Sequence, residues 1–221
     1  LISVRDIHAM KIINENWEIP CSIIPDMAIA TSKFYPKSSL ENQIVNDKAQ
    51  IFVRSYTGKY FCFQMAKQYT EGQLNVIVGQ LRKILSKQIP IVLLPLGLAS
   101  GHEDYVVLEK IYNRLNSPNV FLPTQIHIVD SIALIAHASV FAGTSLHGNI
   151  TAMSYGVPHF SLHPKVEKLK LFLQKWDVEN SQICNNYSEI VEKFKIAINS
   201  DSQALNENAK RLISKVDGFA T

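Results

Sequence analysis

The sequence lacks the features that mark several well-defined classes of protein. Its three cysteines are widely spaced and form no Cys-x-x-Cys pair, so neither a disulfide framework nor a zinc site is expected. No apolar run reaches the roughly 18 residues of a membrane-spanning helix, and no secretory leader is visible. The net charge is only +3, and no run of Lys and Arg is interleaved with aromatic residues, so nucleic acid is not expected as a partner. We expect a cytoplasmic protein, free or at the inner face of the membrane.

Three familiar signatures of nucleotide binding or catalysis are also missing. The chain has no Gly-x-Gly-x-x-Gly fingerprint, no Gly-x-x-x-x-Gly-Lys-Ser/Thr phosphate loop and no Gly-x-Ser-x-Gly nucleophile elbow. Its histidines have no partners at metal-ligand spacing, and no metal or cofactor is expected. The chain does have 221 residues, 47% of them hydrophobic, which is enough to bury an ordinary core.

Apolar runs alternate with amphipathic stretches along most of the chain. Strands are expected at 2–4, 21–24, 49–55, 59–64, 91–96, 120–122, 139–142 and 157–162. Helices are expected at 7–16, 73–87, 103–115, 125–137, 146–155, 166–175, 187–198 and 203–216, with a loop at 31–47. This alternation predicts an α/β fold with a doubly wound, Rossmann-like parallel sheet. We expect residues 1–221 to form a single domain with a helical tail over 185–221.

The most informative stretch is residues 139–162, in which strand, turn, helix and strand follow one another. The turn is Gly143-Thr-Ser145, and His147 lies in the first turn of the helix that follows. In a parallel sheet this layout places the free amide groups of a helix start at the carboxyl edge, where they favour an anion. An imidazole there adds a group that can move protons near neutral pH. In the ordinary alternatives, His147 only hydrogen-bonds a carbonyl, and Gly148 only allows close helix–strand packing.

Two other polar turns are expected at the same edge of the sheet. One is Gly97 to Asp104, which includes His102, and the other is His159 to Lys165. Arg5, at the end of the first strand, is expected to join them. Each has an ordinary alternative: a solvated helix start for His102, a surface charge for Arg5 and a solvated helix face for Lys168.

Four pieces of the sequence, in order over residues 1–176, carry a resemblance to a known family. They are Ile2-Ser-Val-Arg-Asp6 with Ile24-Pro-Asp26; Leu94-Pro-Leu-Gly97 with His102-Glu-Asp104; Gly143-Thr-Ser-Leu-His-Gly148 through Gly156-Val-Pro158; and Lys168-Leu-Lys-Leu-Phe-Leu173. With this ordered set the chain resembles the C-terminal half of the polysaccharide pyruvyl transferase family.

The resemblance implies a two-domain enzyme with a GT-B-like fold and its site between the domains. This chain would be the Rossmann-like C-terminal domain, and an N-terminal domain would be missing before Leu1, where the sequence opens on a strand without an initiator methionine. The implied reaction transfers a pyruvyl group from phosphoenolpyruvate to two hydroxyls of a sugar, forming a ketal on a cell-surface polysaccharide or its precursor. The implied partners are phosphoenolpyruvate and a glycan or lipid-linked sugar acceptor. This chain by itself is expected to be inactive.

Eight residues are candidates for this site. His147 is the catalytic candidate, as an acid and base or as a phosphate contact. The substrate-binding candidates are Arg5, His102, Thr144, Ser145, Leu146, Gly148 and Lys168. Family members often carry arginine where this chain has Ser145, and a hydroxyl cannot replace a bidentate guanidinium. Two alternatives therefore stay open: a GT-B glycosyltransferase domain that binds a nucleotide sugar, and a non-catalytic domain that binds a partner.

Overall fold

The computed structural model describes residues 2–17, 19–70, 72–97, 103–178 and 182–220. The strands are β1 (Ile2–Val4), β2 (Cys21–Ile23), β3 (Phe61–Gln64), β4 (Ile91–Leu93), β5 (Val120–Phe121), β6 (Val140–Gly143), β7 (His159–Ser161) and β8 (Gln182–Ile183). The α-helices are α1 (Ile7–Trp17), α2 (Thr31–Phe34), α3 (Lys37–Leu40), α4 (Asp47–Tyr56), α5 (Leu74–Leu85), α6 (Asp104–Leu115), α7 (Ile128–Ala136), α8 (Leu146–Ser154), α9 (Glu167–Trp176), α10 (Ile190–Ile198) and α11 (Ser202–Ala220). Short 3-10 helices are η1 (Met27–Ala30), η2 (Glu41–Gln43), η3 (Lys67–Tyr69) and η4 (Tyr187–Glu189).

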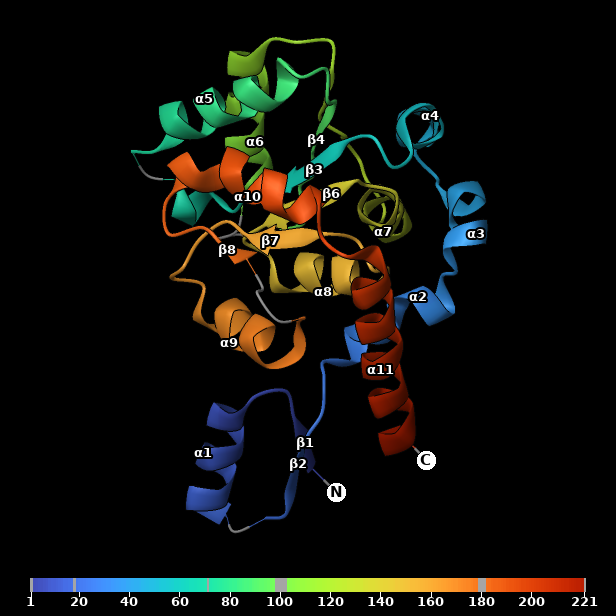
Figure 1. The fold of residues 1–221 in the computed structure, drawn as a ribbon, viewed down its shortest axis with the longest axis vertical. Helices are drawn as coiled ribbons and strands as arrows, with labels where there is room; N and C mark the ends of the chain where they lie inside the picture. The colour runs from blue at the N-terminus through green and yellow to red at the C-terminus, as the bar shows by residue number, and fades with distance from the viewer. Residues whose placement is uncertain (1, 18, 71, 98–102, 179–181, 221) are drawn as a thin grey trace.

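The larger sheet has six parallel strands in the order β5-β4-β3-β6-β7-β8 (Figure 1). From β3 the chain moves outward through β4 to β5, then returns to place β6 on the other side of β3 and continues outward through β7 to β8. The predicted doubly wound, Rossmann-like sheet is therefore confirmed. Its strand order reverses between β3 and β6, and ligands of such sheets bind beyond the carboxyl ends of the strands at that point.

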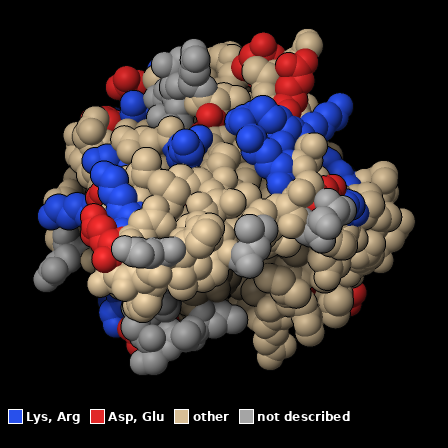
Figure 2. Space-filling view, turned by 90° about the horizontal axis from the view of Figure 1, so that it is seen from below, with Lys and Arg blue, Asp and Glu red and all other residues tan. Residues whose placement is uncertain are grey.

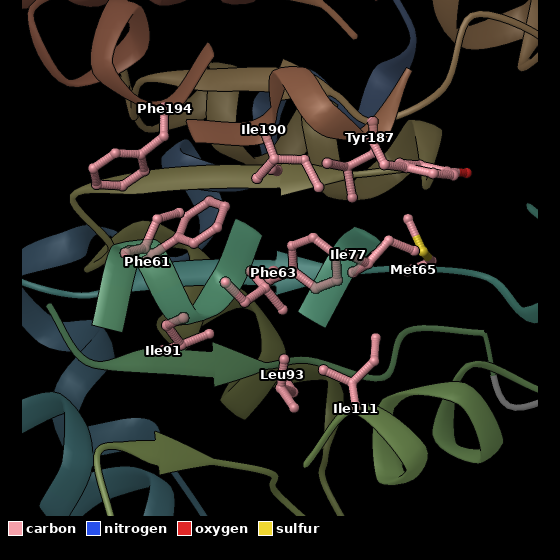
Figure 3. Packing of buried hydrophobic residues seen from close by; sticks show 14 of the residues in the cluster. Phe61, Phe63, Met65, Ile77, Ile91, Leu93, Ile111, Tyr187, Ile190 and Phe194 are labelled. Atoms are coloured by element: carbon pink, nitrogen blue, oxygen red, sulfur yellow. The ribbon is translucent and has the colours of Figure 1, made fainter. Parts of the chain in front are cut away.

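Two layers of helices cover this sheet because side chains alternate between its faces. Phe61 and Phe63 of β3 point to one face and pack with residues of β4, α5, α6 and α10 (Figure 3). Cys62 between them points to the other face, where Val92 of β4 joins side chains of α4 and α7. Burial on both faces explains the near-continuous apolar runs of these strands.

A smaller parallel sheet, formed by β1 and β2, lies apart from the six-stranded sheet in Figure 1. Helix α1 connects its two strands, and Asp6 caps α1 by accepting a hydrogen bond from the amide of Ala9 (2.8 Å). No residue of α1 is buried. The following segment, η1, returns to the larger body and packs with α8, α9 and α11 through buried residues that include Ile29 and Leu212.

The predicted strand at 49–55 is wrong, because these residues lie in α4. The Asn46 side chain caps α4 by accepting a hydrogen bond from the amide of Ala49 (3.0 Å). Ala49 and Val53 are four residues apart and both fully buried, which is the spacing of one helix face. Taken alone, the β-branched and aromatic residues of this stretch favour a strand. In the folded protein they form a helix, one face of which packs against α7.

Two smaller predictions also differ from the structure, and one short strand has no counterpart in the prediction. The stretch 31–47 is not a plain loop but contains α2, α3 and η2, since buried Leu40 and Ile44 anchor it to the core. Helix α7 begins at Ile128 rather than 125, because Asp130 and His127 form a capping box there. Strand β8, only two residues long, has too little pattern to be read from the sequence.

Candidate functional site

A cavity of about 390 Å³ opens beyond the carboxyl ends of β3, β4 and β6, at the point where the strand order reverses. The residues that follow these strands contribute to its wall, as do η3, α7, the start of α8 and the start of α9. Five of the eight candidate residues lie together in this lining as one segment, Thr144 to Gly148, and Lys168 lies there too. Polar turns are expected to meet at this edge of the sheet. The turn that begins at Gly143 lies there, and so do Gly97 and Asp104, the two ends of the other turn that the structure describes.

Gln64, at the end of β3, joins the three central strands at the floor of the cavity. Its Oε1 accepts hydrogen bonds from the amides of Thr144 (2.9 Å) and Ser145 (2.8 Å). Its Nε2 donates to Oδ2 of Asp104 (2.8 Å), and that same oxygen accepts from the amides of Leu96 and Gly97. Gln64 and Asp104 are both almost fully buried, so these bonds replace water for groups that need partners.

Helix α8 begins with two amide groups that have no hydrogen-bond acceptor among the described residues. Ser145 is the N-cap, and its hydroxyl accepts a hydrogen bond from the amide of Gly148 (3.2 Å). The amide of Asn149 is also satisfied, by the Ser145 carbonyl (3.2 Å). The amides of Leu146 and His147 remain, and both residues line the cavity. Unpaired amides and the positive end of the helix dipole make this point favourable for an anion.

The His147 side chain is 69% exposed and faces a carboxylate from another part of the fold. Its Nε2 lies 3.9 Å from Oδ2 of Asp26, which follows β2. The same oxygen accepts a hydrogen bond from Nη1 of Arg5 (3.0 Å), at the end of β1. Arg5 is not part of the cavity lining, so it is connected to His147 through Asp26. The ends of the smaller sheet and the start of α8 thus meet at Asp26.

The two sides of the cavity differ in character. Lys168, in the first turn of α9, is exposed and makes no ion pair with any described residue, which leaves its ammonium group available near the start of α8. The part of the lining that comes from α7 is mostly apolar and includes Ile128 and Ile132 together with Ser131. Ile128 is 71% exposed, although its helical spacing predicts that it faces the core.

Gly148 allows α8 to lie close to the sheet. A Cβ atom at this position would come within 2.6 Å of the Phe141 ring and 2.9 Å of the Leu96 side chain. Of the two explanations left open by the sequence, close helix–strand packing therefore has a direct structural basis. Thr144 is also engaged by the protein, because its hydroxyl accepts a hydrogen bond from the amide of Ala66 (3.0 Å).

His102 falls outside the described residues. In the third polar turn, the His163 ring packs against Tyr69 and Tyr187, at centroid distances of 5.0 and 5.7 Å. Burial, with a smaller contribution from Lys165, lowers the pKa of His163.

Gln64 and Asp26 belong to this site, but the sequence interpretation assigns no role to either. The available signal for Gln64 is a polar residue at the carboxyl end of an otherwise apolar strand, where ligands of doubly wound sheets bind. Asp26 carries a weaker signal, because its nearness to His147 depends on how the smaller sheet is placed against the larger body.

Charged residues do not form one continuous band on the face shown in Figure 2, where Lys and Arg stand in separate groups with wide uncharged areas between them. Within the described parts of the chain, no three His, Cys, Asp or Glu side chains are placed to hold a metal ion. No helix in those parts is long and apolar enough to span a membrane.

Residues 1–164 match the family model described as polysaccharide pyruvyl transferase. No curated protein matches the chain. Among solved structures, the chain is similar to the UDP-GlcNAc 2-epimerase of Methanocaldococcus jannaschii, with a TM-score of 0.64 and 12% identity over 97% of this chain. The match spans 60% of that structure's chain.

Two further structures have the same type of fold. The C-terminal CMP-Kdo binding domain of WaaA from Acinetobacter baumannii gives a TM-score of 0.54 at 14% identity, over 85% of this chain and 99% of that one. Phytolacca americana UGT2 gives a TM-score of 0.55 at 11% identity, and the match covers 93% of this chain and 44% of that one. At these identities the similarity establishes the Rossmann-like fold and nothing about ligands.

Proposed function

The chain belongs to the polysaccharide pyruvyl transferase family, and from that premise we propose that it forms the part of such an enzyme that binds phosphoenolpyruvate. One observation carries the proposal: the amides of Leu146 and His147, which have no acceptor among the described residues, begin α8 at the cavity where the strand order reverses. Phosphoenolpyruvate carries a phosphate and a carboxylate, and such groups bind where helix-start amides and cationic side chains converge.

The proposed reaction transfers the pyruvyl group to two hydroxyls of one sugar. The first hydroxyl adds through oxygen to C2 of phosphoenolpyruvate, and C3 gains a proton to become a methyl group. The second hydroxyl then forms the other C2–O bond while the bond from C2 to the phosphate oxygen breaks. The two hydroxyl groups lose two protons in all. C3 gains one proton, and the released hydrogen phosphate carries the other.

The residues of the site match the demands of this sequence. A positioned group must move protons, and the imidazole of His147 is exposed at the cavity. Charge on the departing phosphate must be stabilised, which suits the two open amides together with Lys168. Arg5, connected to His147 through Asp26, is the guanidinium that we propose in place of the one that Ser145 does not supply.

We further propose that residues 1–221 act as the C-terminal part of a two-domain, GT-B-like enzyme in the cytoplasm or at the inner face of the membrane. Parallel sheets are normally covered on both faces, whereas α1, between β1 and β2, has no buried residue. Additional strands and helices of another domain would cover this unit and contribute contacts to the glycan or lipid-linked sugar acceptor. This chain alone would then be inactive.

Ligand titration of the full-length protein tests the proposal. Phosphoenolpyruvate is compared with a panel of nucleotide diphosphate sugars by calorimetry, and saturable binding of phosphoenolpyruvate is expected. Saturable binding of the nucleotide sugars alone would reject the proposal in favour of a glycosyltransferase donor site.

Substitution of His147 tests catalysis separately from binding. Phosphate release from phosphoenolpyruvate is measured with the membrane fraction of the source organism as the acceptor. His147→Ala is expected to lower turnover by roughly 100-fold or more, the usual range for a lost acid–base group. Lys195→Ala, at an exposed position of α10 outside the cavity lining, is the control and should leave turnover unchanged. Equal turnover in both variants would exclude a catalytic His147.

A further inference from the structure

Asp26 is a sheltered carboxylate between two candidate site residues that come from different sheets. One of its oxygens, Oδ1, accepts a hydrogen bond from the amide of Ala28 (3.1 Å) and so caps η1. The other, Oδ2, accepts from Nη1 of Arg5 (3.0 Å) and lies 3.9 Å from Nε2 of His147. The Asp26 side chain is only 16% exposed, compared with 36% for Arg5 and 69% for His147.

We propose that Asp26 is a positioning residue that holds Arg5 and His147 in a common arrangement for catalysis. Its capping bond fixes the carboxylate, which in turn fixes one end of the Arg5 guanidinium by a charge-assisted hydrogen bond. The backbone of Arg5 is fixed independently, since its carbonyl accepts a hydrogen bond from Nε1 of Trp176 in α9 (2.8 Å). Arg5 is therefore held at both ends, although its side chain is partly exposed.

This arrangement leaves most of the Arg5 hydrogen-bond donors available. A guanidinium has five N–H groups, and only Nη1 has an acceptor among the described residues. The unpaired N–H groups can bind a carboxylate or phosphate with the planar geometry that lysine lacks. Asp26 thus orients the cation while using little of its binding capacity.

Asp26 also determines which side of the His147 imidazole faces the substrate. Nε2 is the nitrogen turned toward the carboxylate, so Nδ1 is left to exchange a proton with the substrate. The 3.9 Å separation is an ion-pair distance, longer than a hydrogen bond, and the exposed ring can rotate to shorten it. A carboxylate in this place stabilises the imidazolium that forms when the ring accepts a proton.

The catalytic part of this inference rests on the function proposed above, and it predicts an unusual kinetic pattern. Asp26 is negatively charged and repels phosphoenolpyruvate, so its removal cannot weaken binding by loss of an attraction. Asp26→Asn in the full-length protein is therefore expected to lower kcat by roughly 100-fold. The KM for phosphoenolpyruvate should change far less than kcat, because loss of the Asp26 charge favours binding of the anion while loosening of Arg5 opposes it. Both constants are measured with the membrane fraction of the source organism as the acceptor.

Two comparison variants separate positioning from folding. Asp26→Glu keeps the carboxylate and should recover part of the lost turnover. Asp201→Asn is the matched control, since Asp201 caps α11 by accepting hydrogen bonds from two amides but lies on the exposed surface. It should leave kcat unchanged. Wild-type turnover in Asp26→Asn, or a loss of the same size in Asp201→Asn, would overturn the inference while leaving the proposed function intact.

A ligand-free measurement distinguishes failure of this inference from failure of the proposed function. In ¹⁵N NMR spectra, a guanidinium held at Nη1 rotates slowly and gives separate Nη signals, whereas a free one gives an averaged signal. We expect separate Arg5 signals in the wild type and an averaged signal in Asp26→Asn. If the wild type releases no phosphate from phosphoenolpyruvate but shows this change, the function fails and the positioning role stands. An averaged wild-type signal overturns the positioning role.

Discussion

Gln64 and Thr144, which are 80 positions apart in the chain, connect the carboxyl ends of the two central strands of the sheet. The backbone amide of Thr144 donates a hydrogen bond of 2.9 Å to the side-chain Oε1 of Gln64. Their strands, β3 and β6, are neighbours at the reversal of strand order. The turn that begins α8 is therefore held by a side chain rather than by the backbone alone.

Gln64→Leu is expected to destabilise the protein by about 3 kcal/mol. The substitution keeps the size of the side chain but leaves the buried amide of Thr144 and the partly buried amide of Ser145 without an acceptor, and an unpaired buried group costs about 1–3 kcal/mol. Urea unfolding measures the loss. Gln68→Leu is the control, because Gln68 is exposed at the same cavity and should change stability by less than about 0.5 kcal/mol. Equal effects of both variants would contradict the role given to Gln64.

Ser145→Arg is expected to have opposite effects on stability and ligand affinity. The hydroxyl that caps α8 is lost, at a cost of about 1 kcal/mol in the free energy of unfolding. The new guanidinium stands in the cavity lining and should strengthen phosphoenolpyruvate binding by roughly 10-fold or more. Ser145→Ala removes the cap without adding a cation and should show only the stability loss. Unchanged affinity in Ser145→Arg would place the phosphoenolpyruvate site away from Ser145.

Gly148→Ala is expected to destabilise the native state by about 1–3 kcal/mol, the usual cost of overpacking a core. The added methyl group would meet the Phe141 ring at 2.6 Å, and that ring is fully buried. Gly79→Ala on α5 is the matched control, since nothing lies within 4 Å of its new Cβ. It should stabilise the protein by up to about 1 kcal/mol, because alanine favours a helix. Thermal and urea unfolding of both variants test this contrast, and a stable Gly148→Ala protein would disprove close packing at α8.

His159 is expected to make stability depend on pH near neutrality. Burial by itself lowers the pKa of His159, but the Asp177 carboxylate and hydrogen bonds to Asp177 and Val157 outweigh it and hold the pKa above the ordinary 6.5. Nε2 lies 3.2 Å from Asp177 Oδ2, with both side chains almost fully buried. A basic group whose pKa is raised on folding stabilises the native state. This stabilisation is complete at a pH below the pKa of the unfolded state, and it is lost as the pH rises through the pKa of the folded state.

The free energy of unfolding should therefore decrease as the pH rises through 6.5 and beyond. His159→Gln should remove most of this slope, and His8→Gln, at an exposed position, should retain it. Urea unfolding from about pH 6 to about pH 9 measures the three slopes. A wild-type slope that persists in His159→Gln would assign the effect to another group.

Local sequence patterns predict most of the elements that position the site. The apolar run before Gly143, the polar turn and the capping Ser145 predict a strand, a turn and a helix start, and the structure contains β6 and α8 at these places. The same approach fails at 49–55, where β-branched and aromatic residues favour a strand but form α4. A short stretch with both preferences takes the conformation that its neighbours can pack against.

The sequence by itself determined the alternation of strands and helices, and with it a doubly wound sheet with a helix start at its carboxyl edge, because these follow from periodicity and capping within a few residues. Only the tertiary structure decided that Gln64 fills the turn below that helix and that Asp26 links Arg5 to His147. These contacts join residues far apart in the chain, and strand order and the placement of the smaller sheet bring them together. No local pattern encodes the strand order or the placement of the smaller sheet, because both depend on which surfaces from distant parts of the chain are buried against one another.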